Sequence, residues 1–270
     1  MTRDLSIILP SYRGADLAQE SVVALAGYLE SLSTSWEIIV VDDGGGDFAE
    51  DPWPDIGNVT VIRLPENRGK GAAVATGMVA ATGAVRIFTD VDLPYDLELL
   101  GVIQHHIRDH GFHVVVGDRT LPGSSYSAHI GWPRRVASGF GSFLIGRLVT
   151  GSFFDSQCGL KGVRGDVADA LFPLLRIDRF AFDVEVIYIA LKHRLDIKRI
   201  PVQLRRNTST SVRVVRDSIR SMTDLGMIKH HQVRGHYRSD VLDAIVVEEA
   251  RAALAHATTE STTRIHNAAG

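Results

Sequence analysis

The sequence predicts an α/β protein with a single domain, in which a mostly parallel β-sheet carries helices on both faces. Two features indicate this class. Short runs that are apolar throughout alternate with longer segments of helical composition over the first half of the chain. A pair of acids follows each of the runs at 36–41 and 85–88, at the carboxyl end of a strand, where the ligands of such sheets bind. Strands that are apolar on both faces are typical of a parallel sheet covered on both sides.

The apolar runs define the expected strands, and the segments between them define the expected helices. "LSIIL" and "WEIIVV" are rich in aliphatic side chains, which favours strands, whereas "GAAVATGMVAA" has the alanine-rich composition of a helix. The strands are expected at residues 5–9, 36–41, 59–64, 85–88, 112–117 and 196–204. The helices are expected at residues 17–32, 71–81, 95–109, 134–151, 183–194 and 212–230.

The C-terminal part of the chain is expected to be less compact. The helix at 212–230 has an apolar face with arginines beside it, which can lie on anionic lipid or be a solvated basic face. We expect the domain to span residues 1–235 and a further helix to span 236–256. Residues 257–270 are polar and small, so a disordered tail is expected there.

Composition excludes several classes of protein. The net charge of −3 over 270 residues gives no sign of a nucleic-acid-binding protein. Cys158 is the only cysteine, so no disulfide forms within the chain, and a reducing compartment is expected. No run reaches the roughly 20 apolar residues of a membrane span, and the first residues do not resemble a signal peptide. We therefore expect a cytoplasmic protein, with peripheral contact at the cytoplasmic face of a membrane left open.

Two acids follow the expected strand at 85–88. Asp90 and Asp92 are two residues apart, so their side chains share a face if the strand continues. Carboxylate oxygens suit Mg²⁺ or Mn²⁺, which often bind one or two carboxylates together with substrate phosphates. The simpler alternative is that both acids are turn and cap residues before the next helix.

Asp42 and Asp43 end another strand, and glycines that allow a ligand to approach closely follow them. Because the carboxyl ends of parallel strands meet at one edge, all four acids are expected on the same rim. An acid there can accept hydrogen bonds from a ribose or a base, although a solvated turn is the alternative. Lys70 begins a helix after a glycine, a position that favours phosphate.

Four motifs in this order, "ILPSYRGADL", "IIVVDDGGGD", "LPENRGKGAAVATGM" and "IFTDVDL", resemble those of the family 2 glycosyltransferases of the GT-A fold. The resemblance covers about residues 5–235 and implies a Rossmann-like GT-A domain over residues 1–235. The stretch "FFDSQCGLKGVRGDVADALFPLLRIDRFAFDVEVIYIA" is similar to the enzymes that glycosylate dolichyl or polyprenyl phosphate, above all the glucosyltransferases, with the dolichyl-phosphate mannose synthases as relatives.

The resemblance also implies roles for individual residues. A nucleotide sugar is expected to contact Pro10, Tyr12, Asp42, Asp43, Lys70, Asp90 and Val91. Mg²⁺ or Mn²⁺ is expected on Asp90 and Asp92. The acceptor or its phosphate is expected to contact Arg134 or Arg135, Ser138, Gln157, and Arg205 or Arg206. The expected catalytic residues are Asp90, Asp92, Arg119, Arg134 and Asp183. Each arginine could instead form a surface ion pair.

Two departures from the family pattern affect the nucleoside side of the site. Arg13 and Gly14 stand where the family usually has Asn-Glu, and Gly45 stands where a serine usually follows the acids. Both departures put the details of base recognition in doubt.

The function that the resemblance implies is an inverting, metal-dependent transfer of a sugar, glucose-type and UDP-linked, to a polyprenyl or dolichyl phosphate. A phosphate acceptor is already ionised and needs arginines to hold it, whereas an alcohol acceptor needs a general base. The alternative is therefore a soluble small molecule or natural product, with Asp183 or Glu185 as the base. A non-catalytic nucleotide-sugar-binding module is a further alternative. The sequence leaves a homo-oligomer open.

Overall fold

A computed structural model describes residues 3–48, 56–124, 158–179, 181–204 and 226–268, with side chains described up to residue 255. Its strands form one sheet in the order β3-β2-β1-β4-β6-β5-β7. The strands are β1 (Leu5–Ser11), β2 (Trp36–Asp42), β3 (Val59–Arg63), β4 (Val85–Phe88), β5 (Val114–Asp118), β6 (Lys161–Arg164) and β7 (Ile197–Pro201). All neighbouring strands pair in parallel except at β6, which runs antiparallel to β4 and to β5.

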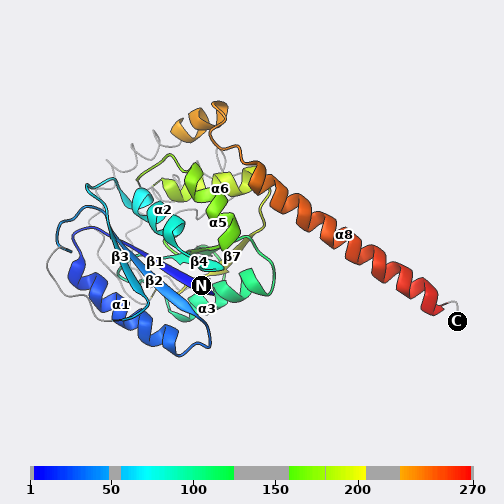
Figure 1. Cartoon of the computed structure of the whole chain (residues 1–270), viewed down its shortest axis with the longest axis horizontal. Helices are drawn as coiled ribbons and strands as arrows, with labels where there is room; N and C mark the ends of the chain where they lie inside the picture. Colours follow the sequence, from blue (N-terminus) through cyan, green and yellow to red (C-terminus); the bar gives the residue numbers. More distant parts are fainter. Residues whose placement is uncertain (1–2, 49–55, 125–157, 180, 205–225, 269–270) are drawn as a thin grey trace.

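Helices cover both faces of the sheet, as the sequence predicts (Figure 1). One face packs against α1 (Ala15–Glu30) and α3 (Glu98–Arg108). The other packs against α2 (Lys70–Ala80), α5 (Gly165–Leu171), α6 (Phe182–Lys192) and the start of α8 (Asp240–Ala268). A short 3-10 helix, η2 (Phe172–Leu174), follows α5. The expected α/β class with a mostly parallel sheet is confirmed.

The β1 strand shows why the strand runs are apolar throughout. Leu5, Ile7 and Leu9 pack into the core beneath α1 and α3, whereas Ile8 packs into the core beneath α2 and α6. Successive side chains of a strand point to opposite faces, so a strand buried on both faces has no position for a solvated side chain. Burial of each such side chain contributes about 1.5–3 kcal/mol to folding.

The α1 helix shows the complementary helical pattern. Its buried residues include Ala18, Val22, Leu25 and Leu29, which recur at intervals of three or four residues and form one stripe. The backbone N–H of Ala15 donates to Oδ2 of Asp47, 3.0 Å away, which satisfies one free donor at the start of the helix. This contact ties α1 to the loop after β2.

The antiparallel strand β6 was not expected from the sequence. Its four residues, "KGVR", carry two charges and have neither an apolar run nor an alternating pattern. Lys161 is nevertheless fully buried, opposite Phe88 of β4 and Val116 of β5. The charge is tolerated there because it is paired, as described below.

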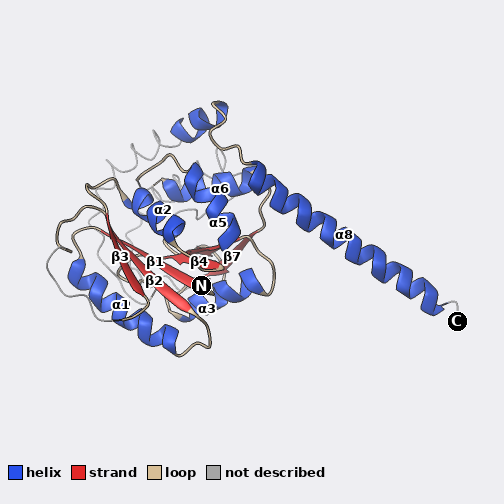
Figure 2. Cartoon of the chain, in the orientation of Figure 1, coloured by secondary structure: helices blue, strands red, loops and turns tan. Residues whose placement is uncertain are grey.

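The C-terminal helix differs from the expected boundaries. The sequence predicts a helix at 236–256 and a disordered tail at 257–270, but α8 is one helix from Asp240 to Ala268 (Figure 2). Figure 1 shows that it leaves the body of the domain and projects away from it. Residues 248–257, "EEARAALAHA", are rich in alanine and glutamate, which have good helix propensity, whereas the threonine-rich stretch after them does not, so propensity leaves the continuation to Ala268 unexplained. Among the helices of the described residues, none combines the length and the hydropathy needed to cross a bilayer.

Two predicted helices fall wholly or mainly outside the description. The helix expected at 134–151 lies outside the described residues. Of the helix expected at 212–230, only the end is described, and residues 226–233 are helical.

Candidate active site

One edge of the sheet gathers the four acids that the sequence predicts there. The parallel strands β1, β2, β4 and β5 all end at this edge, with Asp42 opposite Ser11 in the register. Because β6 is antiparallel, it begins at the same edge, which places Lys161 beside the end of β4. We call this edge the acidic rim; it carries Asp42, Asp43, Asp90, Asp92 and Asp118.

The centre of the acidic rim is an ion pair between Lys70 and Asp90. Nζ of Lys70, the first residue of α2, lies 2.5 Å from Oδ1 of Asp90. Burial lowers the pKa of Lys70, but the nearby carboxylates of Asp90 and Asp183 together have the larger effect, so the net result is a raised pKa. Lys70 therefore keeps its positive charge. The structure thus joins two predicted donor-binding residues directly.

Asp90 also lies against the chain segment that leads into β6. A Cβ atom on Gly159 would lie 2.1 Å from Oδ2 of Asp90, so any larger residue there would displace this carboxylate. The "CGLK" stretch is therefore part of the site, although sequence reasoning assigned no role to Gly159.

A second ion pair lies deeper. Nζ of Lys161 donates to a carboxylate oxygen of Asp183, at the start of α6, and to the carbonyl oxygen of Cys158, 2.6 Å away. Lys161 is fully buried and Asp183 nearly so. A buried charge is tolerated when it is paired and hydrogen-bonded, and Lys161 meets both conditions.

Two aromatic rings separate the ion pairs. The rings of Phe88 and Phe182 have their centroids 5.7 Å apart. Nζ of Lys161 lies 5.5 Å from the centroid of Phe88, and Nζ of Lys70 lies 5.9 Å from that of Phe182. Each cation thus faces both a carboxylate and a ring, which fixes its position. Sequence reasoning missed Lys161, because its partner is visible only in the folded chain.

The two carboxylates considered as general bases have other partners. Asp183 is the counter-ion of Lys161, and its expected catalytic role stays a prediction. Glu185 is fully buried and accepts hydrogen bonds from the hydroxyl of Tyr237 at 2.5 Å and from the backbone N–H groups of Arg176 and Ile177 at 2.9 and 3.0 Å. These contacts give Glu185 a role in holding a loop.

Asp42 and Asp43 hold the loops on the other side of the rim. Oδ1 of Asp42 accepts from the backbone N–H of Gly45 at 2.8 Å. Asp43 accepts from the backbone N–H groups of Arg68 and Gly69 at 2.9 and 2.8 Å. Both carboxylates are almost fully buried, so they shape the site before any ligand binds. Their contact with a nucleoside stays a prediction.

The remaining donor residues differ in exposure. Pro10 is buried in β1 opposite Val41, whereas the Tyr12 side chain is 45% exposed, with the Arg13 guanidinium 5.2 Å from its ring centroid. An exposed ring at the rim can stack on a base. The carbonyl oxygen of Val91 accepts a hydrogen bond from the Ser21 hydroxyl of α1 at 2.5 Å, which anchors the loop between the two acids.

Two residues that depart from the family pattern, Arg13 and Gly45, lie against each other in the structure. A Cβ atom on Gly45 would lie 2.7 Å from the backbone nitrogen of Arg13. Arg13 itself adopts a left-handed backbone conformation with φ of 53°. A serine at position 45 would therefore collide with the backbone at Arg13. The glycine allows the loop after β1 to pass this close to the loop after β2.

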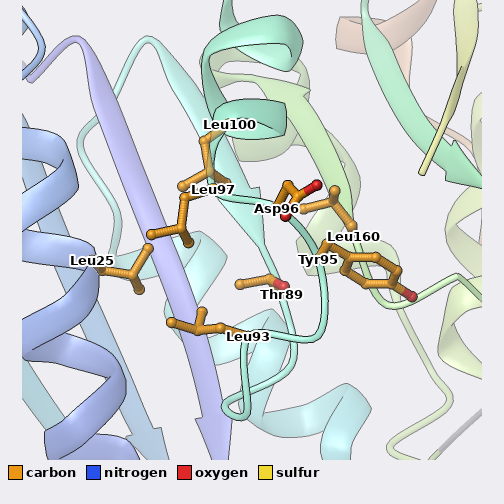
Figure 3. A pocket seen from close by; sticks show the side chains of 8 residues that line it. All are labelled: Leu25, Thr89, Leu93, Tyr95, Asp96, Leu97, Leu100 and Leu160. Atoms are coloured by element: carbon orange, nitrogen blue, oxygen red, sulfur yellow. The ribbon is translucent and has the colours of Figure 1, made fainter. Parts of the chain in front are cut away.

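The loop that carries Asp90 and Asp92 is supported by packed side chains (Figure 3). Beneath it lies a cavity of about 10 Å³, lined by Thr89, Leu93, Tyr95 and Leu160 among others. This volume is about that of one water molecule. The cavity is thus a packing feature that supports the loop.

Asp90 and Asp92 fit a divalent cation that completes its coordination with oxygens from a substrate. Both side chains are partly exposed at the rim, and each offers carboxylate oxygens, the ligand type that Mg²⁺ and Mn²⁺ prefer. In the described part of the chain, no group of three or more histidine, cysteine or acidic residues could hold a metal alone. A divalent ion held by these two carboxylates would complete its coordination with water and with phosphate oxygens of the substrate.

Arg119 follows a rigid anchor at the end of β5. The fully buried Asp118 accepts hydrogen bonds from Thr120, at 2.8 Å from the backbone N–H, and from Nε of Arg199 at 2.5 Å. Burial raises the pKa of Tyr95, and the positive charge of Arg119 partly opposes this rise. Tyr95 pairs in turn with Leu204 through an antiparallel bridge. Arg134, Arg135, Ser138, Gln157, Arg205 and Arg206 lie outside the described residues.

A mostly parallel sheet with an acidic pair and a lysine at its carboxyl rim is the arrangement expected of a nucleotide-sugar-dependent transferase. The chain belongs to glycosyl transferase family 2, whose family model matches residues 6–172. The protein is a glycosyltransferase, and the predicted family is confirmed.

Curated relatives match most of the chain. A dolichyl-phosphate beta-glucosyltransferase of Dictyostelium discoideum is 29% identical over 251 residues, covering 87% of this chain and 76% of that protein. The enzyme of the same description from Drosophila melanogaster is 32% identical over 219 residues, covering 74% of this chain and 66% of that protein. The chain thus spans about two thirds to three quarters of the length of these relatives.

Solved structures confirm the GT-A fold. Glucosyl-3-phosphoglycerate synthase from Mycobacterium tuberculosis in complex with UDP has a TM-score of 0.60 at 16% identity, covering 84% of this chain and 80% of that one. The same enzyme with Mn²⁺, UDP and glucosyl-3-phosphoglycerate has a TM-score of 0.55 at 17% identity, covering 83% and 80%. Mannosyl-3-phosphoglycerate synthase from Rubrobacter xylanophilus has a TM-score of 0.54 at 14% identity, covering 88% and 76%.

Proposed function

We propose that this glycosyltransferase transfers a glucose-type sugar from a UDP-linked donor to a polyprenyl or dolichyl phosphate, with inversion at the anomeric carbon. The relatives from Dictyostelium and Drosophila are dolichyl-phosphate beta-glucosyltransferases, which supports a glucose-type sugar and a dolichyl phosphate acceptor. The solved complex of a GT-A neighbour with Mn²⁺ and UDP supports the donor side.

On the donor side, Asp90 and Asp92 would hold Mg²⁺ or Mn²⁺ against the diphosphate. A bound divalent ion offsets the negative charge that develops on the leaving diphosphate. Lys70 lies beside Asp90 and would bind a phosphate oxygen from the start of α2, where the helix dipole also favours an anion. Tyr12 and Asp42 would hold the nucleoside.

One observation favours an ionised phosphate as the acceptor: the ion pair between Lys161 and Asp183. An alcohol acceptor must lose a proton to a base, and Asp183 and Glu185 are the two acids that the sequence offers for this task. Asp183 is held by Lys161, and Glu185 accepts three hydrogen bonds away from solvent. A phosphate oxygen is already anionic near neutral pH and attacks without a base.

Arginines would hold that phosphate. Arg119 directly follows Asp118, the last residue of β5. Further candidates are Arg134, Arg135, Arg205 and Arg206, with Ser138 and Gln157. A guanidinium binds a phosphate through two parallel hydrogen bonds that a lysine cannot reproduce. Because the lipid of the acceptor is anchored in a bilayer, the protein would contact the cytoplasmic face of a membrane peripherally.

The test measures transfer and donor hydrolysis side by side. Wild-type protein with Mn²⁺ is given UDP-glucose and other nucleotide sugars, with a short-chain prenyl phosphate or with the matching prenyl alcohol. We expect transfer from UDP-glucose to the phosphate and none to the alcohol. Transfer to soluble hydroxyl compounds alone would overturn the lipid acceptor. Arg119→Lys should depress transfer more than donor hydrolysis if Arg119 holds the acceptor.

A further inference from the structure

We infer that Tyr237, acting through Glu185, is a positioning residue for Lys70 and so for the donor half of the active site. Tyr237 lies just before α8 and far from the acidic rim in the sequence. Four consecutive contacts connect it to the rim. The inference rests on the proposed function only in giving Lys70 a donor phosphate to bind.

The first contact joins Tyr237 to Glu185. The Tyr237 side chain is fully buried, and its hydroxyl donates to Oε1 of Glu185 at 2.5 Å. Its ring packs edge-on against Tyr188, with centroids 5.8 Å apart. Its carbonyl oxygen faces Nε2 of His193 at 2.9 Å and accepts a hydrogen bond from Lys192. Tyr237 is therefore fixed at its backbone, ring and hydroxyl.

The second contact joins Glu185 to the loop before α6. The two oxygens of this carboxylate accept from consecutive backbone N–H groups, those of Arg176 at 2.9 Å and Ile177 at 3.0 Å. Residues 175–178 have no regular secondary structure, so these bonds replace a ladder or a helix as the support of the loop. The backbone N–H groups of Arg176 and Ile177 in this loop are therefore satisfied by the Glu185 side chain.

The third contact joins this loop to the first turn of α2. The backbone N–H of Ala72 donates to the carbonyl oxygen of Asp178 at 3.0 Å. A Cβ atom on Gly71 would lie 2.6 Å from the carbonyl oxygen of Ile177, so the two backbones touch. Arg68 adds an ion pair with Asp178 at 3.2 Å.

Lys70 lies between these anchored residues, and its ion pair with Asp90 is the fourth contact. Loss of the Tyr237 hydroxyl would leave Oε1 of Glu185 short of one donor while the ring keeps its packing. The loop would then be held less firmly, and the ammonium group of Lys70 would be less well placed. A displacement of this kind at a binding site reduces affinity without removing any ligand-binding group.

The first measurement reads the position of Lys70 without any substrate. The rate at which Lys70 is acetylated by a water-soluble reagent is followed by peptide mass spectrometry, with Lys198 as the reference lysine in the same sample. We expect Tyr237→Phe to raise the Lys70 rate several-fold and Tyr188→Phe, which removes a neighbouring hydroxyl that does not reach Glu185, to leave it unchanged. An unchanged Lys70 rate in Tyr237→Phe would overturn the inference.

The second measurement reads donor binding. Calorimetry with UDP and Mn²⁺ should show about fivefold weaker binding in Tyr237→Phe, the equivalent of about one hydrogen bond. In a Lys70→Met background, Tyr237→Phe should add no further loss, because the effect passes through Lys70. An equal loss in both backgrounds would contradict the inference. Failure of the wild type to bind UDP would instead count against the proposed function, and the acetylation rates would still decide the positioning role.

Discussion

The ammonium group of Lys70 lies 2.5 Å from Oδ1 of Asp90, so the first residue of α2 and the end of β4 are joined across the acidic rim. This pair holds a positive charge where the metal and the diphosphate are proposed to meet. Lys70 and a divalent ion would therefore share Asp90, and both would act on the donor phosphates.

Lys70→Met should weaken donor binding. The substitution keeps the length of the side chain and removes the cation that is proposed to bind a phosphate oxygen. We expect the dissociation constant for UDP with Mn²⁺ to rise about tenfold, or about 1.4 kcal/mol. Calorimetry measures the effect, and Lys198→Met on β7 is the matched control. Equal affinity in Lys70→Met and wild type would remove Lys70 from the donor site.

Asp92→Ala should abolish metal-dependent binding of the nucleotide. One carboxylate ligand and one compensating charge are lost, so we expect activity to fall by about 100-fold or more. Mn²⁺ affinity, measured by electron paramagnetic resonance with UDP present, should fall in parallel. Asp96→Ala, on the same loop, is the control. Wild-type turnover that persists in EDTA would contradict the metal role.

Asp42→Asn should weaken binding of the nucleoside and leave binding of the diphosphate unchanged. If Asp42 contacts the base or ribose, affinity for UDP should fall about tenfold while affinity for Mn²⁺-pyrophosphate stays the same. The two titrations on the same protein supply their own control. A parallel loss for both ligands would show that the substitution disturbs the loop at Gly45 rather than nucleoside recognition.

Lys161→Met should destabilise the fold. The substitution leaves Asp183 buried without its counter-ion, which typically costs about 3–5 kcal/mol. Urea unfolding should show this loss, and Lys161→Met with Asp183→Leu should recover much of it, because both charges are then absent. If the double variant were as unstable as the single one, packing and not charge would explain the effect.

Glu185→Gln should change how stability depends on pH. Burial raises the pKa of Glu185 above 4.5, although hydrogen bonds from Tyr237 and two backbone N–H groups oppose the shift. A raised pKa means that the folded protein binds more protons than the unfolded chain, so unfolding free energy falls as pH rises from about 4.5 through the raised pKa.

Glutamine does not titrate. As pH rises through this window, the unfolding free energy of the wild type should therefore fall relative to that of Glu185→Gln. Unfolding free energies of both proteins, measured by urea titration at several pH values, give the difference. A difference that stays constant with pH would show that Glu185 keeps the same charge in the folded and unfolded states.

The strands and the acidic rim were predictable because their signal is local. Six of the seven strands were predicted, and four of them, β1, β2, β4 and β5, follow apolar runs and are buried almost throughout, since a strand covered on both faces needs aliphatic side chains. Asp42 and Asp90 could be placed because each stands directly after such a run. Their position at one edge then follows from parallel pairing alone.

Other parts of the site depend on contacts between distant residues. Lys161 lies in a stretch with no strand pattern, and its pairing with Asp183 exists only after β6 enters the sheet. Glu185 looks like a potential base in the sequence, and only its contact with Tyr237, 52 positions away, shows that it supports a loop. The hydrophobic periodicity of a single helix or strand cannot predict a contact between residues so far apart in the sequence.

The placement of β6 also sets the order in which the protein can assemble during synthesis. β4 is followed in the chain by α3 and β5, yet its second neighbour in the sheet is β6, which begins only at Lys161. A nascent chain therefore carries β4 with one edge of unpaired backbone N–H and C=O groups, the kind of edge that invites pairing with other chains. Asp90 gains its neighbour Gly159 only when that edge closes. Emergence of β6 from the ribosome should accordingly be the step that covers the open edge of β4 and brings Gly159 and Lys161 to the acidic rim.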